Sequence, residues 1–357
     1  MTSFNFQSVG LSIIVPVLNE REELPGFLTD LARQQEVDFE LIICDGGSTD
    51  GSCEWLTQQS LTKTTFKLLH CPTGRGRQLN CGIAAAQGEW LLFLHVDSRF
   101  SDPLALKKAL IHVTRSGSVK VAGHFALVFR RSDDIPSLGY YFYEAKARLG
   151  LPETIHGDQG FMIHRQLVTQ VGSFAETLPA MEDTDFADRL RHIGQWQLLP
   201  AEISTSARRF ETEGLWQRQL LGALIMCFRA IEWDAFFTAA PALYRQQSKA
   251  RKLRILPYFK LVKTLHKKLS PAKRWEHWYA CGTYVHLHAW QLFFALDVRR
   301  AFRLGFPPGQ VQTFWLDFLL PVYNFLTDNL FGRGLSTVLL RVWFELTSLW
   351  LKIYEKD

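Results

Sequence analysis

The sequence predicts an α/β fold in which helices cover a sheet, followed by a mainly helical C-terminal region. In the first half, short apolar runs rich in β-branched residues alternate with segments whose apolar residues recur at helical spacing. After residue 245 the helical periodicity continues among many Trp and Phe residues, without a catalytic pattern. With 357 residues, 47% of them hydrophobic, the chain can build a packed core in one large or two modest domains.

Four runs in the first half are typical of buried parallel strands, with helical segments between them. The strands are expected at residues 11–17, 39–44, 66–70 and 90–94. The first helix is predicted by apolar residues at helical spacing, namely Leu24, Phe27, Leu28 and Leu31. This βαβαβ order implies a parallel sheet with helices on its faces. Ligands of such sheets bind beyond the carboxyl ends of the strands, so polar residues there are site candidates.

Polar segments follow two of these strands. The first strand runs into Asn19-Glu20, and the second runs into Asp45-Gly46-Gly47. A carboxylate followed by two glycines can approach a base or ribose closely, because glycine lacks the side chain that would block it. The alternative is a solvated turn in which Ser48 or Asp50 caps the next helix.

The strand at 90–94 runs directly into His95-Val96-Asp97. An imidazole and a carboxylate two residues apart suit a hard divalent cation that bridges phosphate oxygens. Buried ionisable groups at a strand end need such a partner. This segment favours a metal and phosphate site over a simple turn.

Taken in order, these segments resemble family 2 glycosyltransferases of the GT-A fold, over residues 10–215. The family's opening strand and Asn-Glu pair correspond to Pro16, Asn19 and Glu20, and its nucleotide-binding segment to Asp45 and Gly46. The resemblance implies a Rossmann-like mixed sheet flanked by helices. It also implies a nucleotide diphosphate sugar as donor, with a UDP-sugar expected, and a hexosyltransferase-like activity.

The family's metal and base motifs have counterparts as well. Its DxD motif corresponds to His95-Val96-Asp97, so Asp97 inherits the ligand role for Mn2+ or Mg2+ and His95 is left on the donor side. Its Glu-Asp motif is similar to Glu182-Asp183, which makes Asp183 the expected general base. The same acidic segment also suits a helix N-terminus, and we expect Asp185 to have that role.

The resemblance also implies an acceptor side. Gly157, Asp158 and Gln159 stand where the family has a glycine-rich turn, and Arg208-Arg209 is weakly similar to its basic and aromatic motif. The segments 75–78 and 157–160 are further similar to a bacterial subgroup labelled for arsenosugar biosynthesis.

The implied chemistry is a direct displacement that inverts the anomeric centre. Negative charge develops on the leaving diphosphate, and a cation at Asp97 with Arg75 or Arg77 would stabilise it. Both arginines also suit ordinary surface charges. A sugar nucleotidyltransferase would need a Gly-rich, Lys-bearing loop where this chain has Asn19-Glu20, and a dehydrogenase would need a third glycine at Leu79. A non-catalytic nucleotide- or membrane-binding adaptor stays an alternative.

The predicted domains are 1–245, the glycosyltransferase domain, and 246–357, a helical region that is basic and aromatic-rich. Between residues 245 and 274 there are eleven Lys or Arg and no acid. Leu261, Val262 and Leu265 share one helical face there, which predicts an interfacial helix that docks on an anionic membrane. A solvated charged face is the alternative, and nucleic acid is not expected because the strip is aliphatic.

The cysteines predict a cytoplasmic protein, and the basic strip at 245–274 predicts that it is peripheral on the inner membrane face. The six cysteines are scattered without metal-ligand spacing, which suits a reducing compartment. Residues 1–10 lack a signal sequence, and no stretch of eighteen uncharged apolar residues predicts a spanning helix.

Overall fold

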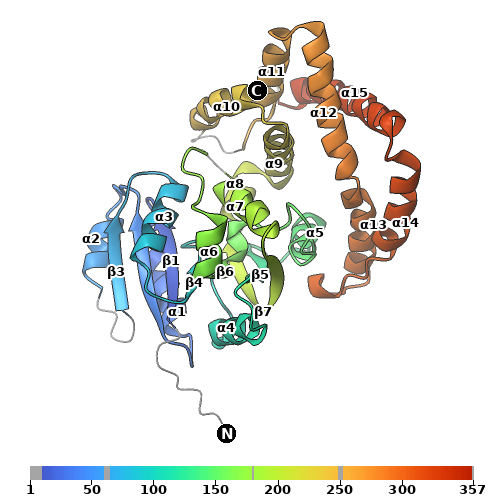
Figure 1. Ribbon diagram of the computed structural model, residues 1–357. Coiled ribbons are helices and arrows are strands. Elements are labelled where there is room, and N and C mark those ends of the chain that lie inside the picture. The colour runs from blue at the N-terminus through green and yellow to red at the C-terminus, as the bar shows by residue number, and fades with distance from the viewer. Residues whose placement is uncertain (1–9, 60–64, 179–180, 248–251, 356–357) are drawn as a thin grey trace. The chain divides into compact units, whose positions relative to one another are not determined.

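The computed structural model describes residues 10–59, 65–178, 181–247 and 252–355 (Figure 1). The chain forms two compact units. The first contains residues 1–130 and 143–206, and the second contains residues 131–142 and 207–357. The division into domains at residue 245 stays a prediction.

The described residues of the first unit form a seven-stranded mixed sheet in the order β3-β2-β1-β4-β6-β5-β7. The strands are β1 Leu11–Val17, β2 Phe39–Asp45, β3 Thr65–His70, β4 Trp90–Phe93, β5 Val121–Arg130, β6 Phe161–His164 and β7 Gln195–Ser206. Strands β3, β2, β1 and β4 are parallel neighbours, as the βαβαβ order predicts. Strand β6 is antiparallel to both β4 and β5, so the expectation of a parallel sheet is wrong there and the mixed sheet is confirmed.

The antiparallel β6 has a consequence for the site. Phe93 at the end of β4 pairs with Phe161 at the start of β6. The residues just after β4 and those just before β6 therefore lie close together, at the carboxyl end of β4 and the amino end of β6. Residues 95–97 and 157–160, more than fifty positions apart in sequence, become neighbours in this way.

Helices α1 Leu24–Ala32, α2 Ser52–Thr57, α3 Arg75–Ala85, α4 Ala105–Arg115, α6 Arg165–Val171 and α7 Glu182–Arg191 belong to the first unit, with the short η1 Gly157–Gln159. Its core joins Ile14 and Leu91 of the sheet to Leu79 of α3, Leu167 of α6 and Phe186 of α7. These three helices therefore cover one face of the sheet.

The second unit is helical where the structure describes it, so the predicted helical C-terminal region is confirmed. Its helices are α8 Arg208–Glu213, α9 Leu215–Ala230, α10 Asp234–Gln246, α11 Leu256–Lys267, α12 Pro271–Leu287, α13 Trp290–Arg303, η2 Pro308–Gln310, α14 Phe314–Thr327 and α15 Leu330–Tyr354. Helix α5 Leu138–Lys146 begins in the second unit and ends in the first. Buried aromatic side chains such as Phe236, Phe259 and Phe344 form its core. Among the described helices, none combines the length and the apolar character needed to cross a membrane.

The structure corrects one part of the predicted membrane strip. Val262 of α11 is fully buried, and Leu261 and Leu265 pack against the same core of the second unit. The apolar face of α11 is therefore occupied by the protein itself and cannot be the face that enters a membrane, because the helix buries it against α9, α12 and α15. Exposed basic residues remain on the strip, including Lys260, Lys267 and Lys268, while positions 249 and 251 lie outside the described residues.

Candidate functional site

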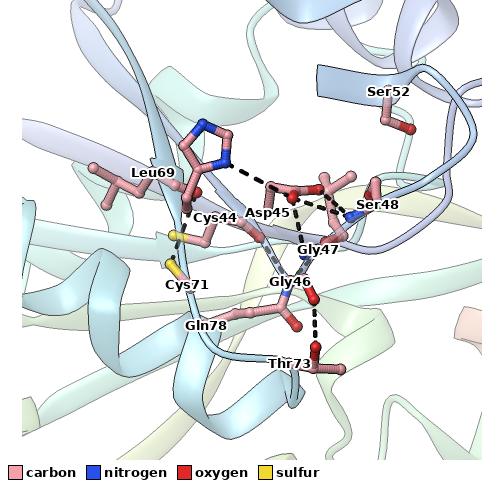
Figure 2. A network of polar contacts seen from close by, with 12 residues as sticks. Cys44, Asp45, Gly46, Gly47, Ser48, Ser52, Leu69, Cys71, Thr73 and Gln78 are labelled. Carbon is pink, nitrogen blue, oxygen red and sulfur yellow. Dashed lines mark hydrogen bonds and ion pairs between the residues drawn. The ribbon is translucent and has the colours of Figure 1, made fainter. Parts of the chain in front are cut away.

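The carboxylate of Asp45 lies at the end of β2 and is only 2% exposed. It accepts hydrogen bonds from the backbone N–H groups of Gly47 (2.9 Å) and Ser48 (3.1 Å), as Figure 2 shows. Burial raises the pKa of Asp45, but the hydrogen bonds from Ser48 and Gly47 outweigh it and hold the pKa below its ordinary value. The group is therefore a fixed anion beside a glycine-rich turn.

The glycine turn is braced from α3. Gln78 is buried, and its amide N–H groups donate to the carbonyls of Val17 and Cys44, both at 2.7 Å. Thr73 donates its hydroxyl to the carbonyl of Gly46 at 2.5 Å (Figure 2). A Cβ at Gly46 would lie 2.9 Å from the Gln78 side chain, so only glycine fits. Neither Thr73 nor Gln78 was predicted as a site residue. For Gln78, the signal available was a polar residue on the first turn of the helix that follows Gly74.

Asn19 joins the loop after β1 to the loop after β2. Its backbone N–H donates to the Ser48 hydroxyl and its side-chain oxygen accepts from the Thr49 N–H, both at 2.8 Å. The residue adopts a left-handed conformation with φ 57°, which Asn tolerates well. Asp50 meanwhile accepts from the Ser52 N–H at 3.0 Å, but the N-cap of α2 is Gly51 and no side chain caps that helix, so the capping role considered for Asp50 is wrong and Asp50 instead orders the turn before the helix.

Pro16 and Glu20 have backbone positions in the same region. Pro16 lies in β1 opposite Cys44 of β2. The carbonyl of Glu20 accepts from the N–H groups of Glu23 and Leu24, both at 3.1 Å, and so starts the turn into α1. The donor-side residues predicted at β1 and β2 therefore lie together at the carboxyl ends of these two parallel strands.

Asp97 is anchored by β7. Its Oδ2 accepts hydrogen bonds from the Thr205 hydroxyl at 3.0 Å and from the Ser206 backbone N–H at 3.2 Å. These partners follow Asp97 by more than a hundred positions, and no local pattern pointed to them. One oxygen of the Asp97 carboxylate is thus held by β7, the edge strand of the sheet.

Asp183 stands at the first turn of α7 and reaches the loop before β6. Its Oδ2 accepts from the Gly157 N–H at 2.7 Å, and its Oδ1 accepts from the Thr184 N–H at 2.8 Å. A Cβ at Gly157 would lie 2.8 Å from Asp183 Oδ2 and 3.1 Å from His95 Nε2, so His95 and Asp183 converge on this glycine. A small cavity here is lined by Arg75, Leu79, Phe93, Leu94, His95, Gly157, Phe161, Phe174 and Asp183.

The acidic groups of this region differ in charge state. Burial raises the pKa of Asp183, but Arg75, His156 and the Gly157 N–H outweigh it, so the pKa lies below its ordinary value. Burial, together with the charges of Asp183 and Asp97, raises the pKa of Asp158 to about 7. Asp158 Oδ1 is buried without a hydrogen-bond partner in the described part of the chain. An unpartnered carboxylate oxygen beside two other carboxylates fits a bound cation.

Arg75 and Arg77 flank a neighbouring hollow. Arg75 lies 3.1 Å from the buried carboxylate of Glu182, whereas Arg77 lies 3.9 Å from the half-exposed Glu176. Burial is the largest cause that raises the pKa of Glu182, and Arg75 opposes it. The hollow is lined by Thr73, Gly74, Arg75, Arg77, Glu176, Thr177, Leu178 and Glu182. Both arginines are thus available to a charged ligand.

Some predicted residues stand apart. Gln159 donates to the Thr154 carbonyl at 2.7 Å and shapes its turn. Arg208 and Arg209 are exposed residues of α8 in the second unit, and their acceptor role stays a prediction. Within the described residues, one trio of possible metal ligands has its atoms within 4.8 Å of one another: Asp45, Cys53 and His70. Asp97 is outside that trio.

Comparison with known proteins gives consistent results. The model of the family "Glycosyl transferase family 2" matches residues 12–172. A Haemophilus influenzae protein named an uncharacterized glycosyltransferase is 31% identical over 203 residues, which cover 56% of this chain and 78% of that protein. A Mycobacterium tuberculosis PGL/p-HBAD biosynthesis glycosyltransferase is 38% identical over 104 residues, or 28% of this chain.

The match to the mycobacterial relative spans 41% of that protein's length. Among solved structures, S. aureus TarS 1–349 in complex with UDP-GlcNAc has a TM-score of 0.49 and 17% sequence identity, covering 83% of this chain and 92% of that one. The family match covers the part of the chain that contains Asp45, Asp97 and Asp158. The chain belongs to glycosyl transferase family 2.

Proposed function

We propose that the protein is a metal-dependent, inverting glycosyltransferase that moves a sugar from a nucleotide diphosphate to an acceptor hydroxyl. The observation that carries the proposal is the convergence of Asp183 and His95 on Gly157, beside Asp158 and close to Arg75. Family membership adds the reaction class.

The loop after β2 suits the nucleoside. Asp45 is an anionic acceptor with two of its hydrogen bonds made by the turn itself, and Gly46 and Gly47 leave room for a ribose or base. Asn19 holds the neighbouring loop against the same turn. We infer a UDP-sugar as donor, with the hollow beside Arg75 and Arg77 for its diphosphate.

The residues present fit a divalent cation. Asp97 would hold Mn2+ or Mg2+, and the orphaned Oδ1 of Asp158 would be a neighbouring ligand or charge partner. The ion supplies charge neutralisation for the departing diphosphate. Thr205 and Ser206 orient the Asp97 carboxylate for this role.

Asp183 is the proposed base. Arg75 and His156 favour its ionised form, so it can accept a proton from the acceptor hydroxyl near neutral pH. Gly157 fixes its orientation through a 2.7 Å hydrogen bond. Glu182, paired with Arg75, positions that guanidinium. Attack from the face opposite the diphosphate would invert the anomeric configuration.

We further propose that the enzyme works in the cytoplasm as a peripheral protein on the inner membrane face. Exposed Lys260, Lys267 and Lys268 give the strip at 245–274 its charge, and each basic residue near an anionic surface contributes about 1 kcal/mol. Nucleic acid is not expected as a partner.

A donor panel tests the reaction class. Calorimetry with UDP- and GDP-sugars, with and without Mn2+, should show metal-dependent binding of one donor. Turnover should release the nucleoside diphosphate and yield a glycoside whose anomeric NMR coupling differs from the donor's. Formation of a nucleotide sugar from a sugar phosphate would favour a nucleotidyltransferase, and binding without turnover on any acceptor would favour an adaptor.

A further inference from the structure

We propose that the hairpin of α14 and α15, residues 314–354, is a membrane-docking element that places its outward apolar side chains in the interface of an anionic bilayer. This inference does not depend on the proposed reaction. It gives the second unit an apolar docking surface other than the buried face of α11.

Helix α15 differs from a typical helix of a soluble protein in where its residue types lie. Of its five buried residues, Gly332, Thr337 and Ser348 are small or polar, and only Phe344 and Leu351 are large and apolar. Large apolar residues occupy the exposed positions, for example Leu346 at 62% exposure and Ile353 at 68%. A helix in water normally turns its apolar stripe toward the core. This distribution indicates an apolar environment outside.

The inward face of α15 already packs closely against α12, so it is not the face that would contact a partner. A Cβ at Gly282 of α12 would lie 2.2 Å from the Thr337 hydroxyl, which shows how closely the two helices approach. Thr337 donates that hydroxyl to the carbonyl of Arg333 at 2.8 Å. Small residues at a close helix contact are typical of packing between helices in lipid.

The exposed apolar side chains concentrate on this hairpin. It contains 18 of the 33 large hydrophobic residues that are exposed in the described structure, and the turn between its helices is the most exposed part. They are Phe314, Trp315, Phe318, Val322, Phe325, Leu326, Leu330, Phe331, Leu335, Val338, Leu339, Val342, Trp343, Leu346, Leu349, Trp350, Ile353 and Tyr354. Contiguous apolar patches of this kind mark interaction surfaces rather than ordinary scatter.

Charge identifies the partner as anionic lipid rather than a second copy. The second unit has 23 basic and 13 acidic residues, a net charge of +10, whereas the first unit has 17 basic and 22 acidic. Two copies of a unit this basic repel each other, while an anionic bilayer attracts it. The hairpin itself is neutral, with Arg333, Arg341 and Lys352 against Asp317, Asp328 and Glu345, so the attraction comes from basic residues elsewhere in the unit, such as the exposed Lys267 and Lys268. Exposed Trp343, Trp350 and Tyr354 suit the boundary between headgroups and acyl chains.

The charged groups inside the hairpin are compatible with shallow insertion. Arg333 pairs with Asp328 at 2.8 Å next to the turn, and Glu345 pairs with Lys263 at 2.6 Å. Because polar residues pack toward the protein and apolar ones point outward, the hairpin would lie in the interface with its apolar side immersed.

Co-sedimentation with vesicles of phosphatidylglycerol and phosphatidylcholine tests the proposal on the full chain. Wild type should bind, and Phe325→Ser/Phe331→Ser, at two side chains that are 88% and 80% exposed, should bind at least about tenfold more weakly. The matched control is Ile111→Ser/Ile135→Ser, which removes exposed apolar groups elsewhere and should bind as wild type does. Circular dichroism and nucleotide-sugar binding should be unchanged in both variants.

Charge and self-association separate the remaining outcomes. Lys267→Glu/Lys268→Glu should weaken binding to anionic vesicles at low salt, because it removes electrostatic attraction. The apolar contribution of the hairpin to vesicle binding should be unchanged. Absence of vesicle binding in wild type, or full binding by the Phe325/Phe331 variant, would overturn the proposal. So would sedimentation velocity showing a wild-type dimer that the same variant abolishes without any lipid binding, because the hairpin would then be a contact between copies.

Discussion

The two units of this protein handle polar and apolar groups in opposite ways. The first unit, with a net charge of −5, holds the carboxylates of Asp45, Asp97 and Asp183 with backbone and hydroxyl donors and leaves Asp158 Oδ1 buried without a partner among the described residues. The second unit, with a net charge of +10, buries Gly332, Thr337 and Ser348 of α15 beside Phe344 and Leu351, and exposes many large apolar residues of the same helix. This difference is the basis for our proposals that the first unit performs the chemistry and that the second unit docks on a membrane.

The largest effect is expected for Asp183→Asn. The substitution keeps the shape and can still accept the Gly157 N–H, but it removes the proton acceptor, so kcat should fall by roughly 10² to 10⁴. Donor binding and vesicle binding should be retained. Steady-state kinetics measure the loss, and Asp185→Asn, two residues further along α7 and paired with Arg189, is the matched control. Near-normal turnover by the Asp183 variant would transfer the base role to Glu182 or Asp158.

Asp97→Ala should remove the metal dependence of donor binding. A cation that neutralises the diphosphate contributes several kcal/mol, so affinity in Mn2+ should fall roughly a hundredfold to the level seen in chelator. The fold should survive, since the substitution removes two hydrogen bonds, from Thr205 and Ser206, outside the apolar core. Calorimetry with and without Mn2+ is the measurement. Wild-type turnover in excess chelator would contradict the metal role.

Gln78→Leu tests whether the first unit depends on the brace beneath its glycine turn. The carbonyls of Val17 and Cys44 would both lose a buried donor, which should lower the free energy of unfolding by about 2 to 4 kcal/mol. Urea denaturation measures this, with Gln35→Leu at an exposed position as control. Equal stability of the two variants would show that water or a shifted side chain replaces the amide.

The smallest effect is a pH dependence at Asp158. Its pKa is raised to about 7 in the metal-free protein, against about 3.9 for an unfolded chain, so the folded state binds the extra proton between these values. Unfolding free energy should therefore fall as pH rises from about 4 to about 7, and metal affinity should weaken up to tenfold per pH unit below 7. Asp158→Asn should flatten both curves. Titrations of Mn2+ binding and urea midpoints from pH 5 to 8 would show whether it does.

Local patterns predicted much of the first unit. The alternation of apolar runs located β1 to β4, and the polar residues that follow them gave Asp45, His95 and Asp97 as site candidates. The strand predictions are confirmed because an apolar run of β-branched residues is a local feature of consecutive positions. The roles of Asp45, His95 and Asp97 stay predictions. Met181-Glu182-Asp183 was found through family resemblance, since an acidic helix start has no unique function.

Other features required contacts that no local pattern encodes. Gln78, Thr205 and Ser206 support site residues from distant segments, and the antiparallel β6 places Gly157 beside His95 and Asp183. Strand register and direction depend on which elements pack together, and a run of apolar residues is the same in either direction.

The sequence gives periodicity, charge and the residues at strand ends, which are properties of consecutive positions. It cannot tell which side of an amphipathic helix meets the core. In α11 the apolar face with Val262 turns inward, and in α15 the apolar face with Leu346 turns outward, although both helices are amphipathic in sequence. That choice depends on which neighbouring helices occupy each face, because the same apolar stripe is stable against protein or against lipid.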